Sequence, residues 1–476
     1  MVDAPFRPLT ERWFHAWSES YDAAMLRVDG DAEGWLTGGD LERRTAGLAA
    51  GLLDRSFDRG DRVVWEAEAS VAAIVVALGV LRAGLVLVPV SARQSALERM
   101  TVITDVDPVL VVSPQPPPTR NGGWEWISAG SIRVGDAPLQ LDAAAPEDLA
   151  LIVYTSGTTG DPKGAMITHG NLVAEADALI EAWGWTHADR LLSALPLFHV
   201  HGLVVALMTG LASGGSVVVQ PAFEAGDFLA TMRETAATMA FCVPTMLHRI
   251  AAHEDAEAVE SLRLLVSGSA PLSVELFNVF AQRGVPILER YGMTETLLTV
   301  SNPLDGERRA GTVGRALPGV ILDAPAPGED PRELRVAGPT VFAGYWHKPE
   351  ATAEILASGW MRTGDIVATD EAGYLMICGR SKELIITGGF NVYPSEVEDV
   401  LCRLPGILEV AVVGEPSPEW GEVVVAHVVT STGTLDLELL EAGAEVLSTY
   451  KRPRRYIAAS SLPRTALGKL QRHLLQ

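Results

Sequence analysis

The stretch LALIVYTSGTTGDPKG, residues 149–164, joins an apolar run of strand length to a segment rich in glycine and hydroxyl side chains. The apolar half contains Leu, Ile and Val without alternating polarity, which favours a strand covered on both faces. The second half offers unobstructed backbone N–H groups, hydroxyls and the cation of Lys163, the donors that a polyphosphate needs. A flexible surface loop is the alternative. We expect a helix to follow the loop from near Asn171, and this order favours anion binding.

The spacing of glycine and lysine in this stretch excludes a P-loop NTPase. That motif requires lysine directly after its second glycine and a hydroxyl residue after the lysine. Here Asp161 and Pro162 separate Gly160 from Lys163, and Gly164 stands where the hydroxyl is required. The phosphate loop, if it is one, therefore belongs to another class of protein.

Similar apolar runs alternate with helical patterns through most of the chain, and this alternation predicts an α/β fold. We expect strands at PVLVVS (108–113), GSVVVQ (215–220), MAFCVP (239–244) and LRLLVSGS (262–269), and helices at NLVAEADALIEAW (171–183) and PLSVELFNVFAQR (271–283). Glycine- and hydroxyl-rich stretches follow several strands. We expect these stretches to converge along one edge of the sheet, where ligands of such folds bind.

The pattern of apolar runs and helical segments ends at about residue 320. Short strands and hairpins are expected after it, with a turn at DEAG (370–373). A smaller α/β unit follows GRSKELI (379–385). Its first helix is SEVEDVLCRL (395–404), and the SEVE start fits a capping box. We therefore predict a large domain over residues 1–379 and a small one over 380–476.

The composition excludes several classes of partner. A formal net charge of −23 argues against a nucleic-acid or anionic-membrane surface. Three cysteines without C-x-x-C spacing indicate a reducing compartment with neither a disulfide framework nor a cysteine-built zinc site. Arg82, Gly84 and Pro89 break the apolar stretch 72–90 into a helix and a strand, and no signal peptide is evident. We expect a cytoplasmic protein without a stable membrane anchor.

Eight short motifs resemble the adenylate-forming family of acyl-CoA synthetases, peptide-synthetase adenylation domains and firefly-type luciferases. They follow in the family's order over nearly the whole chain: YTSGTTGDPKG (154–164), LPLFHVHG (195–202), SGSAPL (267–272), YGMTET (291–296), TGD (363–365), GRSKELI (379–385), GGFNVYPSEVE (388–398) and LGK (467–469). The resemblance implies a large multi-sheet N-terminal domain and a small mobile α+β lid. It also implies that ATP and Mg²⁺ activate a small carboxylic acid as an acyl-adenylate, which the thiol of coenzyme A then attacks.

The resemblance assigns roles to the residues of these motifs. Glu295 matches the Mg²⁺ carboxylate, Thr294 the α-phosphate contact, Asp365 the ribose acceptor and Arg380 a ribose or phosphate contact. The remaining nucleotide-binding positions that it implies are Thr155, Ser156, Gly157, Thr158, Thr159, Gly160 and Lys163 around the phosphates, and Gly268, Ser269, Ala270, Tyr291 and Gly292 around the adenine.

The small domain receives three roles from the resemblance. Lys469 matches the lysine that reaches the carboxylate and the α-phosphate during adenylation, and Lys382 matches the hinge. After the domain turns, Gly388 and Gly389 would help to form the channel for the pantetheine arm.

A second group of residues is expected to line the pocket for the acid and to determine which acid binds. His199 matches the gate of the acyl entrance, and Met293, Ser269 and His201 would line the pocket, although a packing role is the alternative for His201. In CVPTMLHRI (242–250) we expect Thr245 to cap a helix, with Arg249 one turn later on the same face.

The surrounding motifs closely resemble the malonyl-CoA synthetase branch, in which an arginine at the place of Arg249 reads the second carboxylate. An ion pair with Glu254 is the structural alternative for Arg249. We expect malonate or methylmalonate as the acid, and otherwise a medium-chain monocarboxylate.

The thiol acceptor and the enzyme class each admit a second interpretation. GGFNVYPSEVE is closer to the general fatty-acyl branch, and KRPRR (451–455) either contacts CoA phosphates or is a solvated face. A carrier protein is a possible acceptor. A non-catalytic nucleotide-binding relative would have lost Lys469, Glu295 or Lys382, all of which are present, and a luciferase-like oxidation is not separable by motif.

Overall fold

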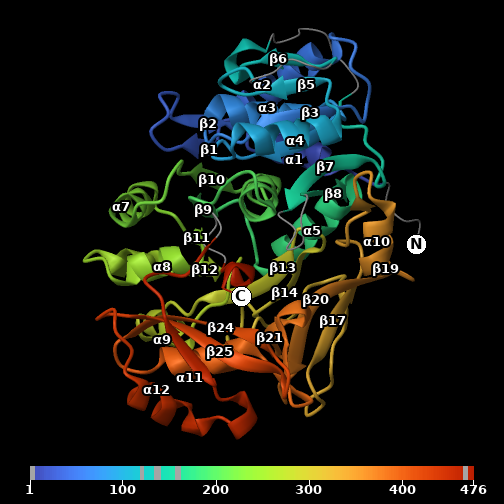
Figure 1. The fold of residues 1–476 in the computed structure, drawn as a ribbon. Coiled ribbons are helices and arrows are strands. Elements are labelled where there is room, and N and C mark those ends of the chain that lie inside the picture. Colours follow the sequence, from blue (N-terminus) through green and yellow to red (C-terminus); the bar gives the residue numbers. More distant parts are fainter. Residues whose placement is uncertain (1–5, 118–122, 133–140, 156–161, 465–469, 476) are drawn as a thin grey trace. The chain divides into compact units, whose positions relative to one another are not determined.

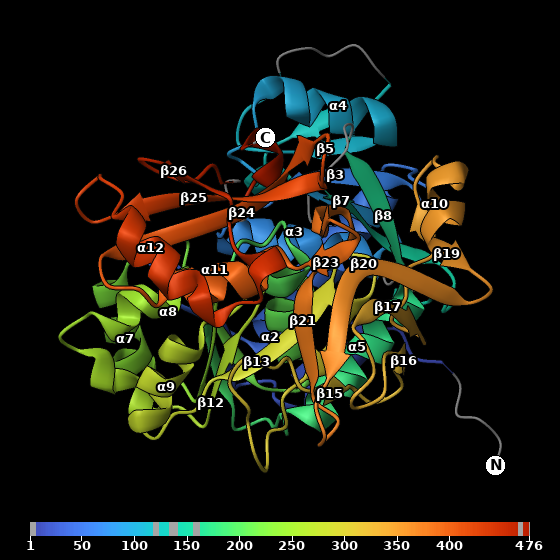
Figure 2. The same ribbon diagram turned by 60° about the horizontal axis from the view of Figure 1, so that its bottom comes forward.

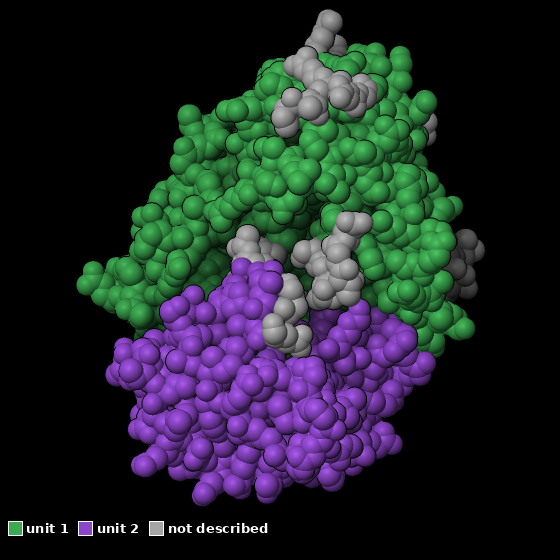
Figure 3. Space-filling model, in the orientation of Figure 1, with its two compact units in different colours: residues 1–322, 336–361 green, residues 323–335, 362–476 purple. Residues whose placement is uncertain are grey.

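The computed structural model describes residues 6–117, 123–132, 141–155, 162–464 and 470–475 (Figure 1). The chain forms two compact units, one of residues 1–322 and 336–361 and the other of residues 323–335 and 362–476 (Figure 3, green and purple). The predicted domain boundary at residue 380 is the expected hinge of a lid domain. It differs from the boundaries of the compact units, and the hinge stays a prediction. In the described part of the chain, no helix is long and apolar enough to cross a bilayer.

A nine-stranded sheet dominates the first unit, in the order β15-β14-β13-β12-β11-β9-β10-β1-β2. Its middle strands, from β13 to β1, run parallel, and antiparallel strands extend it at both ends. The parallel strands are almost wholly buried, which explains their unbroken apolar sequences. The strands are β1 Ala24–Val28, β2 Trp35–Thr37, β9 Arg190–Ser193, β10 Ser216–Val219, β11 Met239–Cys242, β12 Leu264–Ser267, β13 Leu288–Met293, β14 Leu297–Ser301 and β15 Arg315–Ala316.

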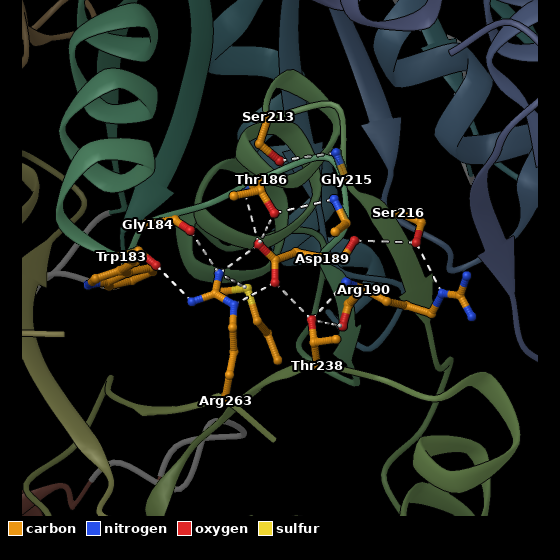
Figure 4. Close-up of polar contacts among 12 residues, drawn as sticks. Trp183, Gly184, Thr186, Asp189, Arg190, Ser213, Gly215, Ser216, Thr238 and Arg263 are labelled. Atoms are coloured by element: carbon orange, nitrogen blue, oxygen red, sulfur yellow. Dashed lines mark hydrogen bonds and ion pairs between the residues drawn. The ribbon is translucent and has the colours of Figure 1, made fainter. Parts of the chain in front are cut away.

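A polar cluster around Asp189 ties together the amino ends of these strands (Figure 4). The carboxylate of Asp189 accepts from Arg263 at 2.5 and 2.7 Å, from the Thr238 hydroxyl at 2.9 Å and from the Thr186 amide at 2.8 Å. Because Asp189, Thr238 and Arg263 each immediately precede a strand, the cluster sets the strands' starting positions. Asp189 is buried, and these donors compensate its lost hydration.

A seven-stranded sheet completes the first unit, in the order β18-β8-β7-β4-β3-β5-β6. Strands β7, β4, β3, β5 and β6 are parallel, whereas β8 and β18 are antiparallel additions. The apolar stretch 72–90 divides as predicted into a buried helix and a buried strand, α3 and β4. The strands are β3 Arg62–Glu66, β4 Val86–Val90, β5 Leu110–Val112, β6 Glu125–Ile127, β7 Leu149–Thr155, β8 Lys163–Thr168 and β18 Gly344–Tyr345.

Two groups of helices pack within the first unit. Helices α1, α5 and α6 contact one another, and α7, α8 and α9 form a second group along one side of the nine-stranded sheet (Figures 1 and 2). The helices are α1 Leu9–Glu19, α2 Gly38–Leu53, α3 Val71–Arg82, α4 Ala96–Val106, α5 His169–Ala182, α6 Thr209–Ala212, α7 Ala225–Thr235, α8 Pro244–Ala251, α9 Val274–Gln282 and α10 Pro349–Ile355.

The C-terminal part of the chain contains several short strands, as its sequence predicts, but β20, β24 and β25 have 10, 11 and 10 residues. One sheet has the order β16-β17-β20-β19 with β21 on β20, and another has the order β23-β22-β25-β24 with β26 parallel to β25. The strands are β16 Ile321–Asp323, β17 Arg332–Ala337, β19 Leu356–Ala357, β20 Trp360–Thr369, β21 Leu375–Arg380, β22 Ile385–Thr387, β23 Phe390–Val392, β24 Ile407–Ser417, β25 Gly421–Thr430 and β26 Arg455–Ala458. Helices α11 (Pro394–Cys402) and α12 (Leu437–Gly443) cover one face of β24 and β25, and Val397, Leu401 and Leu440 pack into that core (Figure 2).

The predicted capping box at residues 395–398 is wrong. Helix α11 begins at Pro394 and has no side-chain cap. The Ser395 hydroxyl instead donates to the Cys378 carbonyl, and Glu398 accepts from Arg472 at 2.7 Å and from the Val412 amide at 2.7 Å. Partners distant in sequence outcompete the local cap because they satisfy a carboxylate that the fold buries.

Candidate active site

Four neighbouring parallel strands bring several predicted site residues to one sheet edge. Strands β9, β11, β12 and β13 are adjacent, so the segments after their carboxyl ends lie along the same edge. These segments contain His199, the start of α8, Gly268 to Ala270 and the YGMTET motif. The phosphate loop follows β7, which belongs to the other sheet, so the expected convergence on a single sheet edge is incomplete.

The phosphate loop is a hairpin loop. Strands β7 and β8 are antiparallel, and Thr155 is the register partner of Lys163. A strand, β8, therefore lies between the loop and the helix that was predicted to start near Asn171. Helix α5 begins only at His169, where Thr168 and Asn171 form a capping box. Of the cationic groups predicted around the phosphates, Lys163 is described, and it is the first residue of β8.

The predicted residues Ser156, Gly157, Thr158, Thr159 and Gly160 lie outside the described residues, as does Lys469.

Glu295 lies in the tight turn between β13 and β14. The Thr296 amide donates to the Met293 carbonyl across this turn, and Thr294 is half-buried beside Glu295. The Glu295 carboxylate is buried and accepts from the Tyr345 hydroxyl at 2.7 Å. Met293, predicted in the acyl pocket, packs against the cluster that contains Tyr345. The motif comparison missed Tyr345, which lies fifty residues along the chain from Glu295 and outside every quoted motif.

Arg290 lies close to Gly268, and the sequence motifs had not indicated it as a site residue. A Cβ at position 268 would lie 2.2 Å from the Arg290 guanidinium carbon, so a side chain here would require Arg290 to move. The register of β12 and β13 brings the segment 268–270 beside Tyr291 and Gly292. Ser269 adopts a φ of +70°, and both Ser269 and Ala270 are exposed.

Arg290 lies in a buried charged cluster with Glu175 and Glu289. Its Nε and Nη2 are buried without a hydrogen-bond partner among the described residues. Burial raises the pKa of Glu175 and of Glu289 to about 8, and burial lowers the pKa of Arg290 to about 10. At pH 7 the arginine is therefore charged while both acids are largely protonated, and the cluster carries net positive charge.

The two histidines of LPLFHVHG have different environments. His201 is buried, stacks on Phe241 with ring centroids 6.0 Å apart, and places Nδ1 3.2 Å from the Ser269 hydroxyl. It begins a π-helix, His201–Met208, a wide helical turn that often occurs at functional sites. His199 is half-buried against Phe198, and burial lowers its pKa to about 4. His199 is consequently neutral at physiological pH.

Arg249 is exposed on α8, one turn after Thr245 on the same face, as predicted. The expected cap is wrong, because Val243 is the N-cap residue, no side chain caps the helix, and Thr245 is itself helical. Arg249 has no ion pair with Glu254, nor any other hydrogen bond, among the residues that the structure describes. Its guanidinium is therefore available to a ligand.

Asp365 and Arg380 are register partners on β20 and β21, with Asp365 Oδ1 2.6 Å from Arg380 Nε. Asp365 is buried, and its amide donates to the Thr363 hydroxyl at 3.1 Å. Lys382 is exposed on the short 3₁₀ helix Ser381–Glu383 directly after β21. Two residues that the motifs predict around one nucleotide are thus brought together.

The glycine pair 388–389 forms the two-residue turn between β22 and β23. Both glycines have positive φ, 57° and 83°, as a type I′ hairpin requires. This turn gives a structural reason for both glycines besides the predicted channel. The exposed ring of Phe390, the next residue, stacks on Tyr450 with centroids 4.6 Å apart.

A Mg²⁺ ion fits the donors present at Glu295. One carboxylate oxygen holds the Tyr345 hydroxyl, and the second has no hydrogen bond to any described residue. Within the described residues, no cluster of three or more metal-ligating side chains exists. A single carboxylate completed by water and phosphate oxygens is the usual way that proteins hold Mg²⁺ with nucleotides.

Most of the chain matches known protein families. Residues 14–346 match the family of AMP-binding enzymes, and residues 396–469 match the AMP-binding enzyme C-terminal domain. A feruloyl-CoA synthase of an Amycolatopsis species is 36% identical, over 94% of each chain. The ATP-bound structure of MatB from Rhodopseudomonas palustris is 36% identical, with a TM-score of 0.88 over 98% of each chain. A malonyl-CoA ligase with bound methylmalonyl-CoA and AMP is 39% identical, with a TM-score of 0.70 over 95% of this chain and 100% of that one.

Proposed function

The chain belongs to the AMP-binding enzyme family and is an AMP-forming acid–CoA ligase that uses ATP, Mg²⁺ and coenzyme A; from this premise we propose that its acid is malonate or a short substituted malonate. The proposal rests on one observation, the charged Arg290 guanidinium beneath Gly268, whose Nε and Nη2 have no hydrogen-bond partner in the described part of the chain. A second carboxylate on the substrate needs such a buried cation, whereas a hydrocarbon chain does not.

The first step joins a carboxylate to the α-phosphorus of ATP and expels pyrophosphate. It gathers negative charge in one place, so the protein contributes mainly position and compensating charge. We assign Lys163 and Thr294 to the phosphates and Glu295 to Mg²⁺, which when bound would neutralise the phosphate oxygens. Lys469 would bring a further cation to the reacting carboxylate and α-phosphate during this step.

Three neighbouring side chains, those of Arg290, His201 and Ser269, support a dicarboxylate as the acid. His201 and Ser269 are joined by a 3.2 Å contact, and burial lowers the pKa of His201, with the Arg290 charge as a smaller cause. One hydrogen lies between His201 Nδ1 and the Ser269 hydroxyl, so the pair keeps one N–H or O–H to donate to a carboxylate while Arg290 provides the positive charge. Because Glu175 and Glu289 are largely protonated at pH 7, they do not cancel that charge.

A second arginine, Arg249, was the sequence-based candidate for the same carboxylate. Its exposure and lack of partners among described residues leave its guanidinium available, but a solvated guanidinium contributes less than a buried one. We therefore propose that Arg290 binds the second carboxylate of the acid. Arg249 contributes at most a long-range electrostatic attraction.

A monocarboxylate remains the alternative acid. A feruloyl-CoA synthase covers 94% of the chain at 36% identity, and that relative's name describes the CoA thioester of an aromatic monocarboxylate. On this alternative, the charge of Arg290 would be balanced within the protein, and the acyl pocket would favour an apolar chain or ring.

For the thiol step we propose that coenzyme A uses a surface of the second unit around Trp420 and Arg454. The Arg454 guanidinium lies 4.1 Å from the Trp420 ring centroid, and the Trp420 carbonyl accepts from the Gly388 amide at 2.8 Å. An aromatic ring with an attached cation suits an adenine and its phosphates. This assignment extends the predicted role of the basic segment 451–455.

The test is pyrophosphate release with ATP, Mg²⁺ and CoA across malonate, methylmalonate, acetate, octanoate and ferulate. Arg290→Lys keeps the charge but not the planar fork, Arg249→Met removes the exposed cation, and Arg43→Met is the control on α2. We expect wild type to prefer malonates and Arg290→Lys to lose about tenfold or more of that preference.

The outcomes separate the alternatives. If the preference for malonates is lost only in Arg249→Met, then Arg249, and not Arg290, binds the second carboxylate. Octanoate or ferulate as the best wild-type substrate, with both arginine variants unaffected in preference, would contradict the dicarboxylate proposal and leave the ligase class intact.

A further inference from the structure

A single segment, VFAGYW at 341–346, connects the predicted metal carboxylate to the phosphate-loop hairpin. The Phe342 amide donates to the Glu295 carbonyl at 2.9 Å. Three residues later, Tyr345 pairs with Ala165 of β8, and the Trp346 amide donates to the Gly164 carbonyl at 2.8 Å. The segment therefore holds the turn after β13 and the start of β8 in one register.

The Tyr345 side chain makes a second connection between the same two places. Its hydroxyl donates to Glu295 Oε1 at 2.7 Å, and the Lys163 Nζ lies 5.2 Å from its ring centroid. The ring also packs edge-on against Phe342 with centroids 5.0 Å apart, and the Tyr345 amide donates to the Thr352 hydroxyl at 2.9 Å. Tyr345 is 8% exposed, so its position is well constrained by packing.

This arrangement has two physical consequences. One Glu295 oxygen is occupied, so the second is the oxygen presented to a cation, and the carboxylate cannot rotate freely. Lys163 and Glu295 thus share one tyrosine as a neighbour, and an ammonium and a carboxylate in direct contact would attract each other. The tyrosine instead gives each partner a separate interaction, a hydroxyl for the carboxylate and a ring face for the ammonium.

We propose that Tyr345 is a positioning residue for adenylation, which holds Glu295 toward the Mg²⁺ of the nucleotide and keeps Lys163 from pairing with that carboxylate. The role concerns the nucleotide step for any acid, so it does not depend on the malonate assignment.

The test compares nucleotide binding with and without metal, in the absence of any acid. Affinity for α,β-methylene-ATP is measured by titration calorimetry, once with Mg²⁺ and once with EDTA, for wild type and Tyr345→Phe. Phenylalanine keeps the ring for Phe342 and Lys163 and removes only the hydroxyl. We expect the Mg²⁺-dependent gain in affinity to fall about tenfold while the metal-free affinity stays within about twofold.

Three further variants complete the design. Glu295→Gln still accepts the tyrosine hydroxyl but lacks the charge, so it should bind the analogue alike with and without Mg²⁺, and adding Tyr345→Phe to it should change nothing further. Tyr456→Phe, which removes a hydroxyl that donates to the Leu440 carbonyl in the second unit, is the matched control.

The result that would overturn the proposal is an unchanged Mg²⁺-dependent gain in Tyr345→Phe. An equal loss with Mg²⁺ and with EDTA would also overturn it, because the tyrosine would then act only on general folding of the site. If Tyr345→Phe does not fold, the Glu295→Gln pair of measurements still decides whether this carboxylate carries the metal dependence on which the role of Tyr345 rests.

Discussion

Asp365 and Arg380 face each other across strands β20 and β21, and their side chains form a 2.6 Å ion pair. Both were predicted from separate motifs to contact the nucleotide. A pair already joined in this way holds both side chains in place at one site, which joint recognition of a ribose would require. This preorganisation lowers the entropy cost of binding.

We predict that Asp365→Asn raises the KM for ATP about tenfold or more, because a hydrogen bond to a charged acceptor is replaced by a weaker one. The KM values for the acid and for CoA should change by less than about twofold. Steady-state kinetics with each substrate varied in turn checks this. An equal rise in all three KM values would indicate misfolding instead of a nucleotide role.

The acids beside Arg290 predict a pH dependence of acid recognition. Since the pKa values of Glu175 and Glu289 are raised to about 8, both ionise as the pH rises through 8 and then offset the charge of Arg290. The KM for malonate should rise by roughly tenfold between pH 7 and 9.5 while that for acetate changes little. Glu175→Gln should reduce the rise. A parallel change for both acids would contradict this explanation.

The same raised pKa values have a consequence for folding. A carboxyl whose pKa is higher in the folded state contributes stability that is fully present below its unfolded pKa and is lost as the pH rises through the folded value. These two residues therefore favour the folded state most below pH 4.5 and progressively less up to pH 8.

Arg263→Met should destabilise the protein without altering substrate affinities, because Arg263 acts at the amino ends of the strands. Its removal leaves the buried Asp189 carboxylate without its charged partner, at a cost of about 3 kcal/mol in the free energy of unfolding. Urea unfolding measures the loss. A change in KM for ATP at a temperature where the variant is fully folded would contradict the structural role.

The Asp189 cluster also has a defined pH window. Burial opposes ionisation of Asp189, but the Arg263 guanidinium and the Thr186 amide outweigh it, and the pKa of the carboxyl is lowered. Its stabilisation is present above the unfolded pKa and disappears as the pH falls through the folded value. The difference between wild type and Arg263→Met should therefore shrink in acid, below about pH 4.

Arg454→Ala should raise the KM for CoA about tenfold while leaving adenylation unchanged, since its guanidinium is exposed on the Trp420 ring. Adenylation is measured without CoA by ATP–pyrophosphate exchange. Arg43→Ala, an exposed arginine on α2, is the control. Loss of the exchange reaction in Arg454→Ala would show that the residue serves the first half-reaction.

Lys469→Ala should abolish adenylation yet spare thioester formation from supplied acyl-adenylate. The prediction follows from the position of LGK in the order of motifs, because Lys469 lies outside the described residues. The two half-reactions are measured separately, the second with chemically prepared acyl-adenylate and CoA. Equal loss in both would remove the assignment.

Several fold elements could be predicted because their causes are local. The strands expected at 108–113, 215–220, 239–244 and 262–269 are present as β5, β10, β11 and β12, and β7 covers residues 149–155, since continuous apolar runs of this length favour buried strands in an α/β pattern. The order of eight motifs likewise identified the AMP-binding family. Local reasoning failed at two helix starts: SEVE was predicted to form a capping box and Thr245 to act as a cap, but distant partners or the backbone satisfy those positions.

By itself, the sequence determined the α/β class, the family and the identity of the motif residues, because these depend on composition and spacing along the chain. Only the tertiary structure decided that Tyr345 holds Glu295, that Arg290 lies beneath Gly268, and that a strand follows the phosphate loop. The physical reason is that these contacts join residues distant in sequence, and the pKa values that give them meaning come from burial, which exists only once the sheets have packed.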